Sequence, residues 1–373
     1  MFITPAYLPW LGGLEVLAAQ LLGELQSRGY EVGLITCPHA SVEAGLDVVA
    51  GVPVLRTGAQ EALARSDGAA VLKCSVEMGR FVRDLGPDVV HTHDSSTALW
   101  TYLRTQRHRR PLVSTIHNVM SAHMGERLAP VAAMVKESAW VTGVSQAVVD
   151  DTARLFPAVV DRLTLVRNAV KPPDARPEPI AERSPLVCIG RLVPQKGFDM
   201  ALEAFALIAS RFSWARLEIA GTGPERDTLE ATARRLGVGD RVEFLGRLEP
   251  DEVPTLLARS TALVMPSRYE GLPLVALEAA WSARPVVAMA GPGLGEAVAD
   301  GETGMLVPPG DVEGLAAALA SLLTSRERAE RMGRAARLRM EQYWSIGAAV
   351  DGYEAIYDAV LSDRIGVDRV AMQ

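Results

Sequence analysis

The chain has 373 residues, of which 49% are hydrophobic, and a formal net charge of −7 at pH 7. This length predicts two domains with large cores, and the acidic balance argues against bulk electrostatic binding of nucleic acid. The three widely spaced cysteines (Cys37, Cys74 and Cys188) indicate a reducing compartment without a disulfide framework, and no apolar stretch is long enough to cross a bilayer, so we expect a cytoplasmic protein.

The first half of the chain alternates predicted strands and helices. It opens on a short strand, Met1–Pro5, followed by the pair Gly12-Gly13 and a helical pattern that runs to Gly29. A glycine pair between a strand and a helix lets backbone amides approach an anion, although most such pairs are only tight turns. The alternation indicates a doubly wound parallel sheet. Its further strands are predicted at Glu31–Cys37, Val52–Leu55, Asp88–Thr92, Leu112–Ile116, Trp140–Val144 and Leu163–Val166.

Three histidines lie at the carboxyl ends of two of these strands, where doubly wound sheets bind their ligands. His91 and His93 end one strand, and His117 follows another. We interpret His91 as a turn histidine whose hydrogen bonds are satisfied inside the protein, and His117 as a contact for a substrate. The sequence argues against a zinc site, because the ligand spacing and the cysteine partners are absent.

A segment rich in proline and polar groups, residues 169–179, is typical of an interdomain linker. Strand–helix alternation then restarts, so the sequence predicts a second doubly wound domain. Its strands are expected at Leu186–Ile189, Arg216–Ala220, Arg241–Phe244, Ala262–Met265, Pro285–Ala288 and Met305–Val307.

Several loops of this second domain are suited to an anion. The loop after its first strand carries Arg191 and Lys196, and three further loops, Gly221–Gly223, Gly246–Leu248 and Gly291–Glu296, are rich in glycine or carry a cation. No dinucleotide fingerprint, P-loop or Asp-x-Asp metal clamp is present. A bound diphosphate would therefore have to be neutralised by Arg191, Lys196 and backbone amides, without a metal.

The segment Ala262–Pro285 reads as a buried strand, a polar loop and an apolar helix that ends near Ser282. Glu278 is the only ionisable residue in that helix, and burial of a lone carboxylate costs several kcal/mol unless it is hydrogen-bonded. Glu270 lies at the mouth of the same helix. Two interpretations stay open: Glu278 pairs with a nearby arginine and Glu270 is a solvated loop charge, or both carboxylates bind a ligand.

The chain resembles the retaining nucleotide-sugar glycosyltransferases of GT-B fold, family four. The residues that carry the resemblance are Glu270-x7-Glu278 after Met265-Pro266-Ser267, Gly190-Arg191 with Lys196-Gly197, and Gly12-Gly13. The resemblance covers nearly the whole chain. It implies an α/β fold with two Rossmann-like doubly wound domains that face each other across a cleft.

The resemblance also implies how the chain is divided. Residues 1–168 would form an acceptor-binding domain, 169–184 a linker, and 185–344 a domain that binds the nucleotide sugar. The C-terminal helix, within 345–373, would cross back onto the first domain and pack there through Tyr353 and Tyr357.

Roles for matching positions follow from the same resemblance. Arg191 and Lys196, with the amides of Gly12 and Gly13, would hold the donor diphosphate. Glu278 would accept hydrogen bonds from the ribose and Glu270 from the donor sugar, with His117 near the transferred sugar and the acceptor. The implied catalytic residues are Glu270, His117, Arg191 and Lys196, and donor contacts are further assigned to Gly221, Gly223, Arg247, Leu248, Gly271 and Leu272. No metal or other cofactor is implied.

The implied reaction moves a hexose or N-acetylhexosamine from a nucleoside-diphosphate sugar, with UDP favoured, to a hydroxyl of a small polar molecule or a glycan precursor. No covalent nucleophile stands out, so retention would rely on same-face attack, with the leaving phosphate taking the acceptor proton. Two departures from the family pattern are Ala169 after Asn168, where glycine is common, and Gly293-Leu294-Gly295-Glu296 in place of Gly-x-Pro-Glu.

Three alternatives stay open at the level of sequence. They are transfer from a GDP-mannose-type donor to a lipid or polysaccharide, a sugar-nucleotide-binding protein without transfer activity, and an epimerase or hydrolase on the same fold. The sequence indicates neither an oligomeric state nor membrane contact, although it leaves contact with a membrane surface open.

Overall fold

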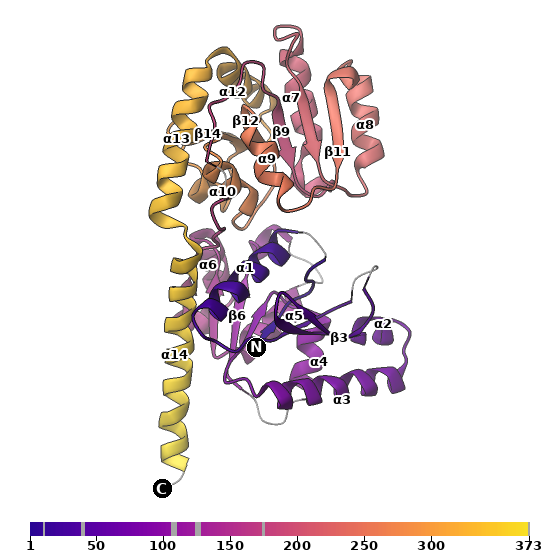
Figure 1. The fold of residues 1–373 in the computed structure, drawn as a ribbon, viewed down its shortest axis with the longest axis vertical. Coiled ribbons are helices and arrows are strands. Elements are labelled where there is room, and N and C mark those ends of the chain that lie inside the picture. The colour runs from indigo at the N-terminus through magenta and orange to yellow at the C-terminus, as the bar shows by residue number, and fades with distance from the viewer. Residues whose placement is uncertain (10–11, 39–41, 106–109, 124–127, 174–175, 372–373) are drawn as a thin grey trace. The chain divides into compact units, whose positions relative to one another are not determined.

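The computed structural model of the chain describes all residues except 10–11, 39–41, 106–109, 124–127, 174–175 and 372–373. The chain forms two compact units, drawn in Figure 1. Unit 1 comprises Met1–Asn168 and Ile346–Gln373, and unit 2 comprises Ala169–Ser345. Both units are α/β, with a mostly parallel sheet between helices, which confirms the predicted fold class.

Unit 1 is built on an eight-stranded sheet of order β3-β4-β2-β1-β5-β6-β7-β8. All neighbouring pairs are parallel except β3 and β4, which form a hairpin. The strands are β1 (Phe2–Ile3), β2 (Leu34–Thr36), β3 (Gly45–Val49), β4 (Val52–Arg56), β5 (Val90–His93), β6 (Leu112–Ile116), β7 (Trp140–Gly143) and β8 (Leu163–Leu165). Strand β3 was not predicted, because it is a largely exposed edge strand with no buried alternating face.

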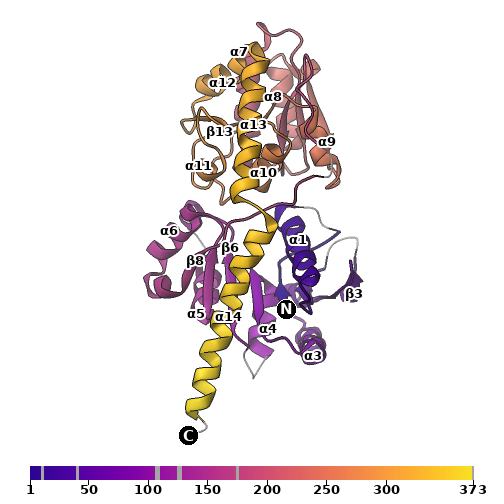
Figure 2. The same cartoon turned by 60° about the vertical axis from the view of Figure 1, so that its left-hand side comes forward.

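The helices of unit 1 cover this sheet and bury their apolar stripes against it. In α1 (Gly13–Ser27) the buried residues recur at the spacing of one helix face, as the sequence predicted. The C-terminal helix α14 (Ile346–Ala371) also belongs to unit 1: Arg28 at the end of α1 forms ion pairs with Asp351 and Glu354 of α14, and Figure 2 shows α14 running past α1 and β8. The remaining helices are α2 (Ala59–Ala64), α3 (Gly68–Leu85), α4 (Thr97–Thr105), α5 (Leu128–Glu137) and α6 (Gln146–Leu155).

Unit 2 contains a six-stranded parallel sheet of order β11-β10-β9-β12-β13-β14. All six predicted strands are present, with small shifts at their ends. They are β9 (Leu186–Ile189), β10 (Leu217–Ala220), β11 (Val242–Gly246), β12 (Ala262–Met265), β13 (Val286–Met289) and β14 (Gly304–Val307). The chain runs outward from β9 to β11 and then returns to place β12 beside β9, so the direction of winding switches between these two strands.

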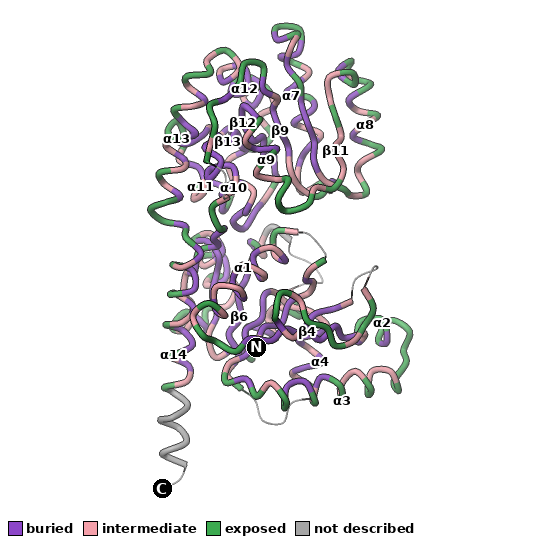
Figure 3. Tube along the Cα trace, viewed as in Figure 1, coloured by how far each residue is buried: buried purple, intermediate pink, exposed green. Residues whose placement is uncertain are grey.

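Alternate residues of the unit 2 strands enter two separate apolar cores, one on each face of the sheet. One core packs against α7 (Phe198–Ala209), α8 (Arg226–Arg235), α12 (Val312–Thr324) and α13 (Arg326–Tyr343), and the other against α9 (Glu252–Ala258), α10 (Leu274–Trp281) and α11 (Leu294–Ala297). Figure 3 shows the central strands of unit 2 as buried. Because both faces are covered, the strands read as continuous apolar runs, which explains why their positions were predictable.

The segment 169–184 packs against unit 2 in its described part, residues 169–173 and 176–184. Ala169, Val170 and Ile180 are all buried, and the Trp281 indole donates a hydrogen bond to the Val170 carbonyl at 3.1 Å. In the part of the chain that the structure describes, we find no helix with the length and apolar character needed to cross a membrane.

Candidate active site

The switch between β9 and β12 places two loops of unit 2 side by side at the carboxyl edge of the sheet. Ligands of doubly wound sheets bind at such a switch point. The loop after β9 carries Arg191 and Lys196, and the loop after β12 carries Glu270. The two loops are joined by hydrogen bonds from the Arg268 amide to the Gln195 carbonyl, at 2.9 Å, and from the Gln195 side chain to the Tyr269 carbonyl, at 3.1 Å.

Lys196 and Glu270 form an ion pair at the centre of this edge. The Lys196 Nζ atom donates to Glu270 Oε1 at 2.7 Å, and only 15% and 7% of the two side chains are exposed. In the free protein each of these charges therefore satisfies the other. A ligand anion that binds the Lys196 ammonium would compete with Glu270 for it, and displacement of the Glu270 carboxylate would release it to accept hydrogen bonds.

Glycines allow the backbones of neighbouring loops at this edge to contact each other directly. Gly197 (φ +64°) and Gly293 (φ +78°) adopt left-handed backbone conformations, and a Cβ atom at either position would overlap a carbonyl oxygen, of Pro266 and of Gly271 respectively. Gly221 and Gly223 face carbonyls of the β9 loop in the same way. The Gly221 amide already donates to Gly246 O at 2.6 Å, so Gly221 has a packing role here.

We expect Gly293→Ala to disrupt this edge. The new methyl group would push against the Gly271 carbonyl and, behind it, the Glu270 carbonyl, while alanine is strained at φ +78°. The loss of stability should be roughly 3 kcal/mol or more, measured by denaturant unfolding. Gly295→Ala in the same loop is the matched control, because a Cβ atom there meets nothing within 4 Å. Equal stability of the two variants would contradict this account of Gly293.

Glu278 lies on α10, half-buried, and its carboxylate makes no hydrogen bond or ion pair within the described part of the chain. Burial raises the pKa of this carboxyl group from 4.5 to about 7. The interpretation in which Glu278 pairs with an arginine is therefore not what the structure shows. A half-buried acceptor without a partner, on the helix that follows the Glu270 loop, is suited to a ligand that donates hydrogen bonds.

The other residues predicted in unit 2 lie in loops that follow β9, β11 and β12, at the same carboxyl edge of the sheet. Arg191 is exposed, and its guanidinium makes no hydrogen bond within the described residues. Gly271 and Leu272 are buried in the loop just before α10. After β11, Arg247 is exposed and Leu248 is half-buried. Among the described residues, no group of three or more His, Cys, Asp or Glu side chains is placed to hold a metal ion.

In unit 1, three histidine rings gather at the carboxyl ends of β5 and β6. His91 is satisfied at both nitrogens, by Tyr357 Oη and by Thr115 Oγ1, each at 2.7 Å. This confirms the satisfied state predicted for His91, although the residue lies on a strand and not in a turn. Tyr357 comes from α14, so the C-terminal helix completes this cluster.

His117 is held by His93, whose Nδ1 atom lies 2.9 Å from His117 Nε2. Its Nδ1 atom has no hydrogen bond within the described part of unit 1, and the ring is half-buried. Burial lowers the pKa of all three imidazoles, which keeps them uncharged at neutral pH. His117 therefore offers a neutral, oriented imidazole and not a positive charge.

Asp94, directly after β5, was not predicted as a functional residue from the sequence. Its backbone is left-handed (φ +61°), which is uncommon for a residue with a side chain, and its carboxylate accepts from the His117 amide at 3.4 Å. The only signal in the sequence was an aspartate at the end of a strand. Strained residues of this kind cluster at functional sites, so Asp94 joins His117 in the candidate site of unit 1.

Gly12 and Gly13 lie at the start of α1, and the space beside Gly12 is already occupied. Gly12 has an extended backbone (φ −138°, ψ 174°), so it does not need the conformational freedom of glycine. A Cβ atom there would instead overlap the carboxylate of Glu15, a side chain that is itself buried. A phosphate at this helix start would thus have to approach or displace the carboxylate of Glu15.

Comparisons with known proteins agree with this arrangement. The family model described as "Glycosyltransferase Family 4" matches residues 11–172, and the one described as "Glycosyl transferases group 1" matches residues 172–339. The glycogen synthase of Mycobacterium tuberculosis is 33% identical over 366 residues, covering 88% of this chain and 87% of that protein. The D-inositol 3-phosphate glycosyltransferase of Acidothermus cellulolyticus is 32% identical over 397 residues, covering 95% and 87%.

A solved structure shows the same fold over nearly the full length. Anabaena HepE in complex with UDP-glucose superimposes with a TM-score of 0.77 at 18% identity, covering 97% of this chain and 99% of HepE.

Proposed function

The chain belongs to glycosyltransferase family 4 and is a glycosyltransferase of GT-B type, and on this premise we propose that it moves a hexose or N-acetylhexosamine from a UDP-sugar to an acceptor hydroxyl with retention of anomeric configuration. The observation that carries the proposal is the Lys196–Glu270 ion pair at the switch point of unit 2, together with the unpartnered Glu278 on α10, the helix that follows the Glu270 loop. Two cations on these loops, with the Glu270 and Glu278 carboxylates on the loop and helix after β12, suit a ligand that combines a diphosphate with sugar hydroxyls.

The first step is donor binding in unit 2. The diphosphate takes Lys196 from Glu270 and adds the exposed Arg191, since a guanidinium and an ammonium both pair with phosphate oxygens. Glu270 then accepts hydrogen bonds from the donor sugar, and Glu278 from the ribose. Arg247 and Leu248 frame the base, and the Gly271 and Leu272 backbone supports the sugar side.

The second step is cleavage of the bond between sugar and diphosphate. Negative charge grows on the leaving oxygen, and Lys196 and Arg191 stabilise it; groups that are positioned in advance for such a charge are worth a few kcal/mol each. The leaving phosphate takes the acceptor proton, so attack occurs on the same face. In unit 1, the neutral His117 hydrogen-bonds the acceptor. No metal is needed in this scheme, because the two cations neutralise the diphosphate.

For the acceptor we propose a small polar molecule or a glycan precursor. The Acidothermus cellulolyticus relative, named for D-inositol 3-phosphate, supports a small polar acceptor, and the Mycobacterium tuberculosis glycogen synthase supports a glycan. The UDP preference is supported by HepE, whose structure contains UDP-glucose.

A thermal-shift panel of UDP, GDP, ADP and their sugars, with and without magnesium, tests the donor. We expect UDP and UDP-sugars to stabilise the protein by about 2.7 kcal/mol at 100 times Kd, independently of magnesium. Arg191→Ala should remove most of this shift without changing the stability of the free protein, because Arg191 is exposed. A shift with GDP or ADP alone would replace the UDP assignment, and no shift with any nucleotide would overturn the donor site.

Product analysis separates transfer from its alternatives. Without an acceptor, a glycosyltransferase should leave most of the donor intact, whereas an epimerase or hydrolase would convert it. A protein that only binds sugar nucleotides would give no product with any acceptor in a screen.

A further inference from the structure

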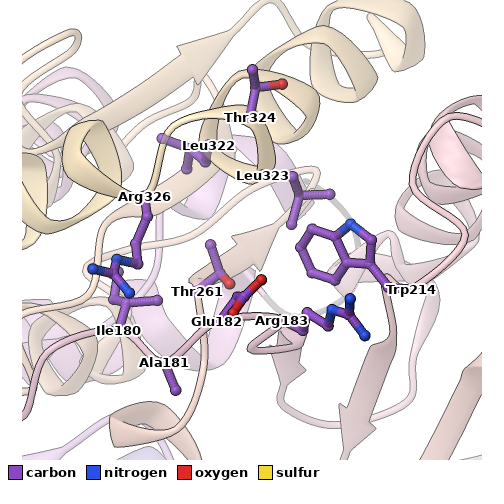
Figure 4. Close-up of a pocket in the computed structure, with 10 residues that line it drawn as sticks. All are labelled: Ile180, Ala181, Glu182, Arg183, Trp214, Thr261, Leu322, Leu323, Thr324 and Arg326. Atoms are coloured by element: carbon purple, nitrogen blue, oxygen red, sulfur yellow. The ribbon is translucent and has the colours of Figure 1, made fainter.

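Unit 2 has a recess at the edge of its sheet opposite to the Lys196–Glu270 pair. The recess has a volume of about 260 Å3. Its residues precede β9, β10 and β12 or lie around the junction of α12 and α13, so they lie at the amino ends of the strands. Figure 4 shows Trp214 on one side and Arg326 on the other, with Glu182 and Thr261 between them.

Arg183 contributes to this recess at a conformational cost. Its backbone is left-handed (φ +64°), a conformation for which glycine or asparagine is preferred. Its side chain is exposed and makes no hydrogen bond or ion pair within the described residues. The Arg183 side chain therefore makes no polar contact that would stabilise the described part of the fold. Strained positions of this kind are often retained for a functional side chain.

The charges around the recess are mixed and incompletely paired. Glu182 is exposed and without a partner in the described part of unit 2, and Arg326 has only a long ion pair, at 3.5 Å, with Glu330. An anionic ligand would be repelled by Glu182, and a cationic ligand by Arg183 and Arg326. Neutral hydroxyl groups, which both donate and accept hydrogen bonds, match all three side chains.

Trp214 adds an apolar platform to this polar rim. Its side chain is half-buried, and its indole makes no hydrogen bond within the described residues. Aromatic side chains with one edge exposed to water commonly serve as contact surfaces for binding partners. A pyranose ring presents the matching shape, with C–H bonds on its face and hydroxyls around its rim.

We propose that this recess binds one pyranose unit of a neutral carbohydrate, with the ring against Trp214 and its hydroxyls between Glu182, Arg183 and Arg326. The site lies apart from the donor residues and does not depend on the nucleotide. On a glycosyltransferase it would retain a glycan between transfers, a consequence that rests on the proposed function, whereas the binding itself does not.

The test is titration with maltotriose, a soluble run of three glucose units, followed by NMR of protein labelled with 15N at the tryptophan indoles. The chain has six tryptophans, and Trp214→Phe assigns the relevant signal. We expect maltotriose to shift the Trp214 indole signal, and Arg183→Gly to weaken that binding at least tenfold. Because glycine relieves the strained backbone, Arg183→Gly should unfold at the same temperature as the wild type or a higher one.

Ser66→Gly is the matched control. Ser66 is another exposed residue with a left-handed backbone (φ +54°), but it belongs to unit 1 and lines no part of the recess. It should leave the Trp214 titration unchanged. The proposal is overturned if Trp214 does not respond to maltotriose, if Arg183→Gly binds as tightly as the wild type, or if inorganic phosphate shifts the same signal at lower concentration than maltotriose. No nucleotide is present, so these outcomes are independent of the donor assignment.

Discussion

Lys196→Met is expected to lower turnover by a factor of about 10²–10³, the usual loss when one preorganised group for a developing negative charge is removed. Methionine keeps most of the side-chain length that lies against Gly190 but carries no charge. The leaving diphosphate would then depend on Arg191 and backbone amides alone. Steady-state kinetics with a saturating nucleotide sugar measure this loss in kcat, separately from weaker donor binding.

Lys196→Met should also lower the stability of the fold, and the experiment must separate this loss of stability from the loss of turnover. Glu270 is almost fully buried, and removing one partner of a buried ion pair typically costs 3–5 kcal/mol. The double variant Lys196→Met with Glu270→Gln removes both charges, so it should recover stability but not turnover. Lys73→Met, which breaks an exposed pair with Glu77 on α3, should change both quantities little. Recovery of turnover in the double variant would refute the role of Lys196 in catalysis.

The strands that are buried on both faces of the sheet were predictable, because every residue in them faces an apolar core and the sequence is therefore continuously apolar. The strands of unit 2 and the positions of Lys196 and Glu270 at the ends of β9 and β12 follow from apolar runs bounded by turn residues. Strand β3 did not follow, because only its partner β4 is buried, and the Ala50-Gly51 turn that joins them (φ +50° and +79°) differs from the usual asparagine or aspartate with glycine.

Contacts between distant side chains were not predictable from local patterns. Lys196 and Glu270 are 74 positions apart, and nothing in either loop specifies that they pair in the free protein. Nor does the pair Gly12-Gly13 reveal that the carboxylate of Glu15 fills the space beside Gly12. In each unit, a position predicted to meet an anion is thus close to a carboxylate of the protein. We infer that donor binding replaces contacts between charged groups of the protein. This replacement makes the net free energy of donor binding less favourable, but it favours ligands whose negative charge is large enough to displace a carboxylate.

Glu278→Gln is expected to weaken binding of the nucleotide sugar roughly 10–100-fold at pH 8, as hydrogen bonds to a charged group contribute about 1.5–3 kcal/mol. In the wild type, affinity should also fall as the pH drops below 7, by up to about tenfold per pH unit. The reason is that burial raises the pKa of Glu278 to about 7, and only the ionised carboxylate accepts hydrogen bonds from both ribose hydroxyls. Affinity is measured by calorimetric titration with the intact nucleotide sugar. Its diphosphate has no terminal phosphate whose own ionisation would change the affinity with pH.

The free protein provides an independent check on the same group. The folded pKa of Glu278 lies above its unfolded value of 4.5, so the folded state holds the proton more tightly. This contribution to stability is fully present below pH 4.5 and is lost as the pH rises through 7, by at most roughly 3 kcal/mol since the side chain keeps some contact with water. Glu278→Gln cannot ionise, so it should be more stable than the wild type at pH 8 and equal to it at pH 4.5. A variant that is less stable at pH 8 and binds the nucleotide sugar normally would show that Glu278 supports the fold and not the ribose.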